Sequence, residues 1–161
     1  MRVKEFDESL YWDEFEECYR TWKRELNSLR VLEVKHGMVE AEIWVGADGF
    51  STTGIPERYF DAWWEAFDFN EKIIEEKTHV KVLSVDWDIP NDTIGLTVKV
   101  MGKPSDVLEA FYLVCTLMEL KWLEAWQVYP KWKSLVRKQW YKDTPEEWLK
   151  EIEKLRKLIY G

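Results

Sequence analysis

Two tryptophans and two carboxylates are the side chains of this sequence that we expect to bind a small molecule: Trp44, Trp64, Glu42 and Asp86. The ring face of a tryptophan attracts cations, and nearby carboxylates add negative charge and accept hydrogen bonds. Such a combination suits a sugar or a quaternary amine. If the chain is built from two related halves, these four side chains would line a cleft between them.

Sequence motifs for catalysis, metal binding or cofactor binding are missing. The two histidines, His36 and His79, are far in sequence from both cysteines, Cys18 and Cys115, so we exclude a zinc site. We expect both thiols to be buried on separate helices, with a disulfide as the alternative. The glycine-rich stretch GADGFSTTG lacks the lysine of a phosphate loop, and the acidic turn at 86–92 lacks calcium-loop spacing. We therefore expect no cofactor and no metal, and we favour a protein without catalytic activity over an enzyme.

A pair of opposed carboxylates could also carry chemistry. The predicted hairpin places Glu33 directly opposite Glu40, and like charges in such a position repel each other. A buried pair would share a proton, as acid–base enzymes require. An exposed pair would be solvated or compensated by Arg30 and Lys35, and this is the interpretation that we favour.

Eleven tryptophans in 161 residues exceed what one modest core is expected to bury completely. Tryptophan and other aromatic residues are enriched at the centres of protein interfaces. We therefore predict a binding module that associates with itself as a homodimer, or with another protein, through aromatic helix surfaces. The residues expected at this interface are Trp12, Tyr19, Tyr59, Trp63 and Trp64, with Trp44 as a further candidate.

The net charge of −8 is distributed unevenly along the chain. From Lys131 onward there are nine basic and five acidic residues, which gives +4 and leaves −12 for the rest. We expect this basic, tryptophan-containing segment to fold back onto an acidic face of its own sheet. A partner protein in its place is one alternative. Nucleic acid is another, but the acidic body disfavours it.

The spacing of apolar residues predicts an α+β fold, a two-layer sandwich with helices on one face of a four-stranded antiparallel sheet. The order is α-ββ-α-ββ-α, followed by two further helices. Residues 1–130 would form this body, and residues 131–161 a helical extension packed on it. The expected helices cover residues 7–27, 56–77, 105–127, about 132–140 and the end from Thr144, and the expected strands cover 29–35, 38–45, 79–89 and 93–101.

The turn His36-Gly37 fixes the expected register of the first hairpin. It places Val34 opposite Val39 and Leu32 opposite Ala41 on the inner face. The outer face would carry Val31, Glu33, Glu40, Glu42 and Trp44, and in the second pair Ser84, Asp86 and Asp88, while Leu83, Val85 and Trp87 would point inward.

An internal duplication would explain the repeated order of elements. Residues 30–34 (RVLEV) resemble residues 81–85 (KVLSV) at an offset of 51 residues. This similarity predicts two αββ units related by a pseudo-two-fold axis, with chance resemblance as the alternative.

The composition is that of a soluble globular protein, with 46% hydrophobic and 34% charged residues, and we expect it in the cytoplasm. The sequence has no signal-peptide pattern, and its longest apolar run, 107–123, is interrupted by charges, so we expect no membrane contact. It contains 21 Glu and 16 Lys but only 2 Gln and 3 Asn, a bias typical of hyperthermophiles.

Overall fold

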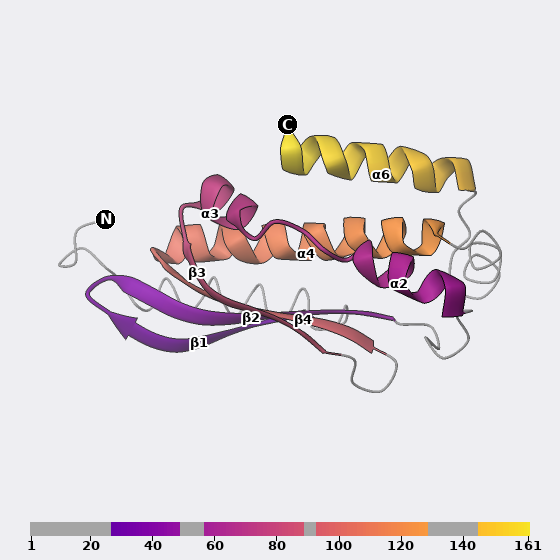
Figure 1. The fold of residues 1–161 in the computed structure, drawn as a ribbon. Helices are drawn as coiled ribbons and strands as arrows, with labels where there is room; N and C mark the ends of the chain where they lie inside the picture. The colour runs from indigo at the N-terminus through magenta and orange to yellow at the C-terminus, as the bar shows by residue number, and fades with distance from the viewer. Residues whose placement is uncertain (1–26, 49–56, 89–92, 129–144) are drawn as a thin grey trace.

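The computed structural model describes residues 27–48, 57–88, 93–128 and 145–161. These residues form a four-stranded antiparallel sheet with helices on one of its faces (Figure 1), which confirms the predicted α+β architecture. The strands are β1 (Asn27–Lys35), β2 (Met38–Asp48), β3 (Lys81–Asp88) and β4 (Thr93–Gly102). The helices are α2 (Glu57–Glu65), α3 (Lys72–Thr78), α4 (Pro104–Gln127) and α6 (Pro145–Tyr160).

The strands lie in the order β1-β2-β4-β3, so each hairpin contributes one central and one edge strand. The first hairpin turns at His36 and Gly37, whose φ angles are 54° and 75°. Positive φ at both central residues defines a type I′ turn, whose twist matches that of the flanking strands. The two-residue turn that the sequence predicts is therefore confirmed.

Each edge strand contains one bulge, and the two bulges correct the predicted register. The pairing shifts at Leu32 in β1 and at Leu83 in β3, where a bulge places one extra residue in the strand. Val31, rather than Leu32, therefore pairs with Ala41, and Val82 takes the corresponding inner position in β3. The prediction that both leucines point into the core is wrong, because they are 40% and 41% exposed.

The two bulges fall at positions that are equivalent under the sequence repeat, because Leu32 and Leu83 are 51 residues apart. The order β1-β2-β4-β3 is also symmetrical about the centre of the sheet. The helix expected before the first hairpin, at residues 7–27, lies outside the described residues. The duplication therefore stays a prediction.

The core lies between the sheet and α4. Helix α4 contacts both central strands and also packs against α2, α3 and α6, as expected for the most buried helix. Its apolar character follows from these contacts on nearly every side. The fully buried residues include Val39, Ala41, Ile43 and Val45 of β2, Ile94, Leu96, Val98 and Val100 of β4, and Val107, Ala110, Phe111, Val114, Leu117 and Leu120 of α4.

The single helix predicted for residues 56–77 is wrong, because the chain forms two helices with a break at residues 66–71. Asn70 Oδ1 accepts a hydrogen bond from the backbone N–H of Lys72 at 3.1 Å, which favours a new helix start. Helix α3 ends at Thr78, and the capping residue His79 has a left-handed φ of 60°. Glu75 Oε1 then accepts the backbone N–H of Val82 at 2.9 Å and ties α3 to the edge strand β3.

Helix α4 begins one residue earlier than the predicted cap at Ser105-Asp106. Lys103 has extended backbone angles and Pro104 occupies the first turn, where its missing N–H has no helical partner to lose. The helix ends at Gln127, as the sequence predicts.

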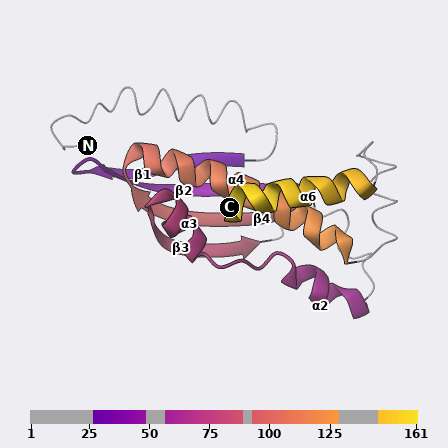
Figure 2. The same cartoon turned by 90° about the horizontal axis from the view of Figure 1, so that it is seen from above.

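Helix α6 lies on α4, on the side away from the sheet (Figures 1 and 2). Ile152, Leu155 and Ile159 are buried in this contact, in agreement with the predicted apolar stripe. The prediction that the chain end covers the acidic face of the sheet is therefore wrong for α6. The apolar surface of α4 left uncovered by the sheet provides the physical reason, because α6 can bury its stripe there.

Several predictions concern residues that the structure does not describe, among them the helix at about 132–140, Cys18 and the boundary at residue 130. Cys115 is buried on α4, as expected. Of the helices in the described ranges, none has the length and the apolar composition needed to cross a membrane.

Candidate functional site

The face of the sheet turned away from the described helices carries charged, polar and aromatic side chains, and we call it the open face. Alternation along each strand places these residues opposite the buried aliphatic ones. The open face consists of Ser28, Arg30, Glu33 and Lys35 of β1, Met38, Glu40, Glu42 and Trp44 of β2, Gly95, Thr97, Lys99 and Met101 of β4, and Lys81, Ser84, Asp86 and Asp88 of β3.

The indole ring of Trp44 lies over Gly95 of the neighbouring strand. A Cβ atom placed on Gly95 would be 2.9 Å from Trp44 Nε1 and 3.2 Å from Trp44 Cζ2. The ring thus fills the space above the glycine, and Gly95 is buried while Trp44 is half-buried. Gly46 of β2 pairs with Gly95, so two glycines lie side by side at this point. Glycine inside a strand often marks a close approach of this kind.

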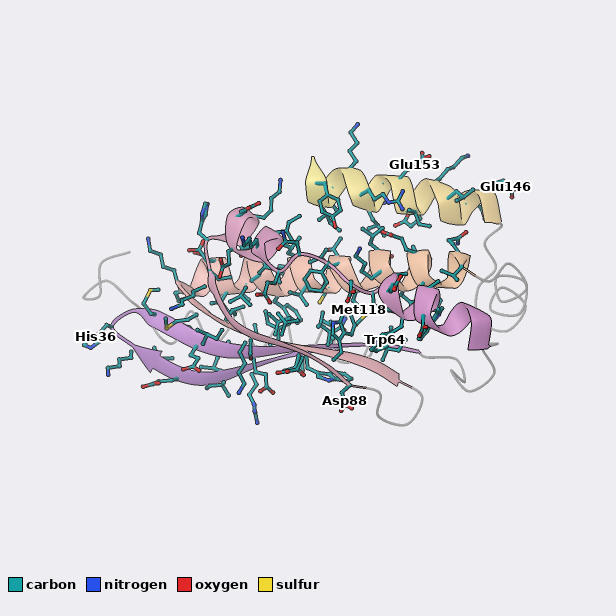
Figure 3. All side chains as sticks on the ribbon, viewed as in Figure 1. His36, Trp64, Asp88, Met118, Glu146 and Glu153 are labelled. Carbon is teal, nitrogen blue, oxygen red and sulfur yellow. The ribbon has the colours of Figure 1, made fainter. Side chains whose placement is uncertain are left out.

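Two aspartates of β3 stand one strand beyond this ring. Asp88 pairs with Gly95, and Asp86 pairs with Thr97. Since neighbouring strands are about 4.8 Å apart, the carboxylates lie next to the position that the ring reaches. Both aspartates are exposed, and Figure 3 shows Asp88 on the side of the sheet away from the helices.

Glu42 is engaged in an ion pair within the first hairpin. Arg30 Nη2 donates to Glu42 Oε1 at 3.2 Å, and the two side chains are 68% and 24% exposed. An ion pair so close to solvent contributes about 1 kcal/mol or less to stability. It nevertheless compensates the charge of Glu42, so Asp86 is the more available of the two predicted ligand-binding carboxylates.

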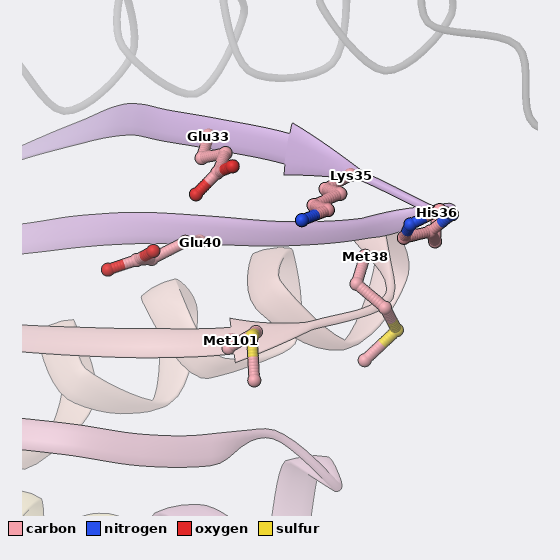
Figure 4. Close-up of a pocket in the computed structure, with 6 residues that line it drawn as sticks. All are labelled: Glu33, Lys35, His36, Met38, Glu40 and Met101. Carbon is pink, nitrogen blue, oxygen red and sulfur yellow. The ribbon is translucent and has the colours of Figure 1, made fainter.

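The opposed carboxylates Glu33 and Glu40 line an open hollow of about 260 Å³ at the turn end of this face (Figure 4). The predicted pairing of Glu33 with Glu40 is therefore confirmed. Neither forms an ion pair within 4.0 Å among the described residues, and Arg30 pairs elsewhere. The walls of the hollow are completed by Lys35, His36, Met38 and Met101.

Trp64 lies on the opposite side of the sheet from Trp44. Its ring is 5.9 Å from the rings of both Trp63 and Trp87, and 5.8 Å from that of Phe67. These rings form an aromatic cluster between α2 and the helix side of β3. The predicted cleft that would bring Trp64 together with the other three ligand-binding residues is therefore wrong, because the sheet separates them.

The structure describes only some of the predicted interface side chains, and these differ in burial. Trp63 is only 1% exposed and packs inside the chain, so it cannot form an outer surface of the folded protein. Trp64 is half-buried. Trp12 and Tyr19 lie outside the described residues, and Tyr59 belongs to α2 with its side chain outside the description.

The exposed apolar side chains of α6 were not expected from the sequence. Leu149 and Leu158 are 51% and 69% exposed. Tyr160 is also exposed, and it lies beside an ion pair in which Arg156 Nη2 is 3.4 Å from Glu124 Oε2 of α4. Partial burial raises the pKa of the Tyr160 hydroxyl above its ordinary value of 10.0, with Glu124 adding to the shift and Arg156 opposing it.

Gly95, which lies beneath the ring of Trp44, is another residue of the candidate site that the sequence analysis missed. The available signal was Gly95 within the predicted strand 93–101, where glycine is unfavourable, together with Gly46 directly after the predicted strand 38–45. Their pairing could not be inferred without the β2–β4 register. Within the described ranges, no three His, Cys, Asp or Glu side chains gather closely enough to hold a metal ion.

Comparisons with known protein families, with curated proteins and with solved structures found no match. The geometry of the chain itself is therefore the basis for a functional proposal. Its most distinctive arrangement is the tryptophan ring over a buried glycine on a polar sheet face, with two exposed aspartates on the next strand.

Proposed function

We propose that the protein is a non-catalytic binding module whose ligand lies on the open face of the sheet, on the ring of Trp44. The observation that carries this proposal is the position of the indole over Gly95, at a tryptophan that is only half-buried. An aromatic ring held in this way offers a ligand a flat surface that is ordered before binding, which lowers the entropic cost of association.

The local sequence supports a role beyond stability. Glycine within a strand is less stable than alanine by about 0.5–1 kcal/mol, and here two glycines face each other at Gly46 and Gly95. A ring on a polar face contributes less to the core than a buried ring does. A surface for recognition accounts for both features.

The proposal of a binding rather than a catalytic role is supported by the setting of the carboxylates. Acid–base catalysis by paired carboxylates depends on burial that raises the pKa of one of them. Glu33 is exposed in an open hollow, and Asp86 is exposed on an edge strand. Neither carboxylate is therefore in the buried setting that such catalysis requires.

Nuclear magnetic resonance tests the proposal directly. We expect at least one of three probes, glucose, choline or acetate, to shift the resonances of the Trp44 indole N–H and the Gly95 amide. Trp44→Leu should strongly reduce the probe-induced shift of the Gly95 amide. Tyr112→Leu, which removes an exposed aromatic side chain from α4, is the matched control and should leave it unchanged. Probe-induced shifts confined to the helices, or no shifts at all, would contradict the proposal.

Self-association is a second candidate function, favoured by the exposed apolar side chains of α6. Leu149, Leu158 and Tyr160 are each more than half exposed, so a second copy could cover them. Sedimentation velocity of the full chain should then show a dimer that Leu158→Lys disrupts, whereas Lys157→Ala, a neighbouring exposed position, should not. A wild-type monomer at high concentration would rule this candidate out.

Nucleic-acid binding through the basic segment is the weakest candidate. Helix α6 contains four acidic and four basic residues and is therefore electrically balanced. The basic excess of the chain end lies in residues 131–144, outside the described residues. This candidate predicts binding that weakens steeply with salt.

A further inference from the structure

The ring of Trp44 extends from β2 across the neighbouring strand toward two carboxylates. Its Nε1 edge lies over Gly95, and Gly95 pairs directly with Asp88 of the next strand. Asp86 is two residues away from Asp88, on the same face. A ligand resting on the ring beside β3 would therefore have both carboxylates next to it.

The charges around the ring favour a positively charged ligand. The exposed carboxylate of Asp86 stands on its β3 side, with Asp88 two residues away, and the charge of Glu42 is compensated by Arg30. Among the described residues, a further cation on this part of the face is Lys99, which pairs with Glu42 and lies two residues beyond Thr97 along β4. The chain as a whole carries −8, so an anion would be repelled over the approach as well.

The spacing of the carboxylates bears on how a cation would be held. Asp86 and Asp88 are separated by two residues, about 6.6–6.8 Å along the strand, so only one of them could form the paired hydrogen bonds that a guanidinium group makes. A quaternary ammonium group needs no hydrogen bonds. It is stabilised by the face of a ring together with negative charge at somewhat longer range.

We propose that the ligand recognised on the open face is a quaternary or fully methylated ammonium group, which rests on the indole of Trp44 with Asp86 and Asp88 beside it. This inference rests on the proposed function and specifies its ligand. With a single ring in the described part of the site, we expect affinity in the millimolar range. Removal of the ring should weaken binding on the order of tenfold.

The experiment compares choline with its uncharged isostere, in which a tert-butyl group replaces the trimethylammonium group. The two probes have nearly the same shape, so their difference reports the charge alone. Binding to the full chain is followed through the Trp44 indole and Gly95 amide resonances at millimolar concentrations. Choline should shift both signals saturably, and the isostere should bind at least several-fold more weakly.

Three variants, with Asp68→Asn as a control, test which side chains are responsible for choline binding. Trp44→Leu should weaken choline binding about tenfold. Asp86→Asn should weaken it several-fold, whereas Asp68→Asn, at an exposed position between α2 and α3, should not. Gly95→Ala would place a methyl group where the ring lies and should weaken binding without removing any charge. Thermal unfolding of each variant verifies that it is folded.

The outcomes separate this inference from the proposed function. Equal binding of choline and the isostere, or binding of glucose alone at Trp44, would overturn the cationic ligand and leave the binding surface in place. The cationic ligand would likewise be overturned if Asp86→Asn and Asp68→Asn had the same effect on choline binding. If none of the probes perturbed Trp44 or Gly95, both the inference and the proposed function would fail.

Discussion

The helix-facing side of the sheet is closed and apolar, whereas the open face is polar, charged and only partly buried. On β2, Ile43 is fully buried while its neighbours Glu42 and Trp44 remain half-exposed. On β4, the same contrast separates Leu96 from Thr97. Adjacent residues of one strand therefore have different roles. One face supplies the apolar burial that stabilises the fold, and the other is free to vary in its surface chemistry.

The largest expected effect comes from a cavity on the helix-facing side. Ile43→Ala should lower the free energy of unfolding by about 2–5 kcal/mol, because the surrounding side chains cannot fully collapse into the space. Glu42→Ala, at the next position of the strand, should lower it by about 1 kcal/mol or less. Urea unfolding followed by circular dichroism measures both. Similar losses of unfolding free energy for the two variants would contradict the proposed difference between the two faces of the sheet.

A smaller effect on stability is expected when alanine replaces either of two glycines of β4, Gly102 and Gly95, which lie on opposite faces of the sheet. A Cβ on Gly102 would meet Val80 Cγ1 at 3.0 Å and the backbone Cα of Val80 at 3.4 Å, within the buried side. Gly102→Ala should therefore destabilise the fold by about 1–3 kcal/mol.

Gly95→Ala provides the counterpart, because the half-exposed ring of Trp44 can move away from the new methyl group. We expect a change in unfolding free energy below about 1 kcal/mol, since alanine also reduces the entropy of the unfolded chain. Choline binding should nevertheless weaken. If Gly95→Ala were the more destabilising of the two variants, the open face would have to contribute more to stability than its exposure suggests.

The smallest expected effect is a loss of stability at alkaline pH, and it involves Tyr160 of the helix layer. The pKa of Tyr160 is raised in the folded protein, so the unfolded chain loses this proton first as pH rises above 10.0. The unfolded state then binds fewer protons, and stability falls with rising pH until the folded tyrosine ionises as well. Tyr160→Phe should reduce this loss, as measured by urea unfolding at neutral and alkaline pH.

Choline keeps its charge at alkaline pH, so the same titration also probes the open face. Ionisation of Tyr160 should leave choline affinity of the folded protein unchanged, because α4 and the sheet lie between the two places (Figure 1). A parallel change in affinity and stability across this range would show that the faces are coupled.

Local patterns in the sequence were sufficient to predict much of the fold. Period-two alternation and the His36-Gly37 turn predicted the first hairpin, including the pairing of Glu33 with Glu40. A long apolar segment that follows Ser105-Asp106 and ends before Pro130 predicted α4. These features depend on neighbours within a few residues, and such information is present in a single sequence.

The remainder depends on contacts between distant segments. A bulge at Leu32 or Leu83 adds one residue to a strand without changing the apolar composition, so alternation alone assigned both side chains to the wrong environment. Trp44 and Trp64 could not be assigned to opposite sides of the sheet before the position of α2 was known. The pairing of Gly46 with Gly95 likewise requires the register between two hairpins.

The edge strands limit how this sheet can grow. Leu32 and Leu83 each interrupt the row of backbone groups at an edge, and the carboxylate of Glu75 occupies the N–H of Val82 beside the second interruption. Another molecule could add a strand only along an unbroken row of such groups. Fibril formation by stacking of native molecules edge to edge is thus hindered, and concentrated solutions should remain free of β-rich aggregates.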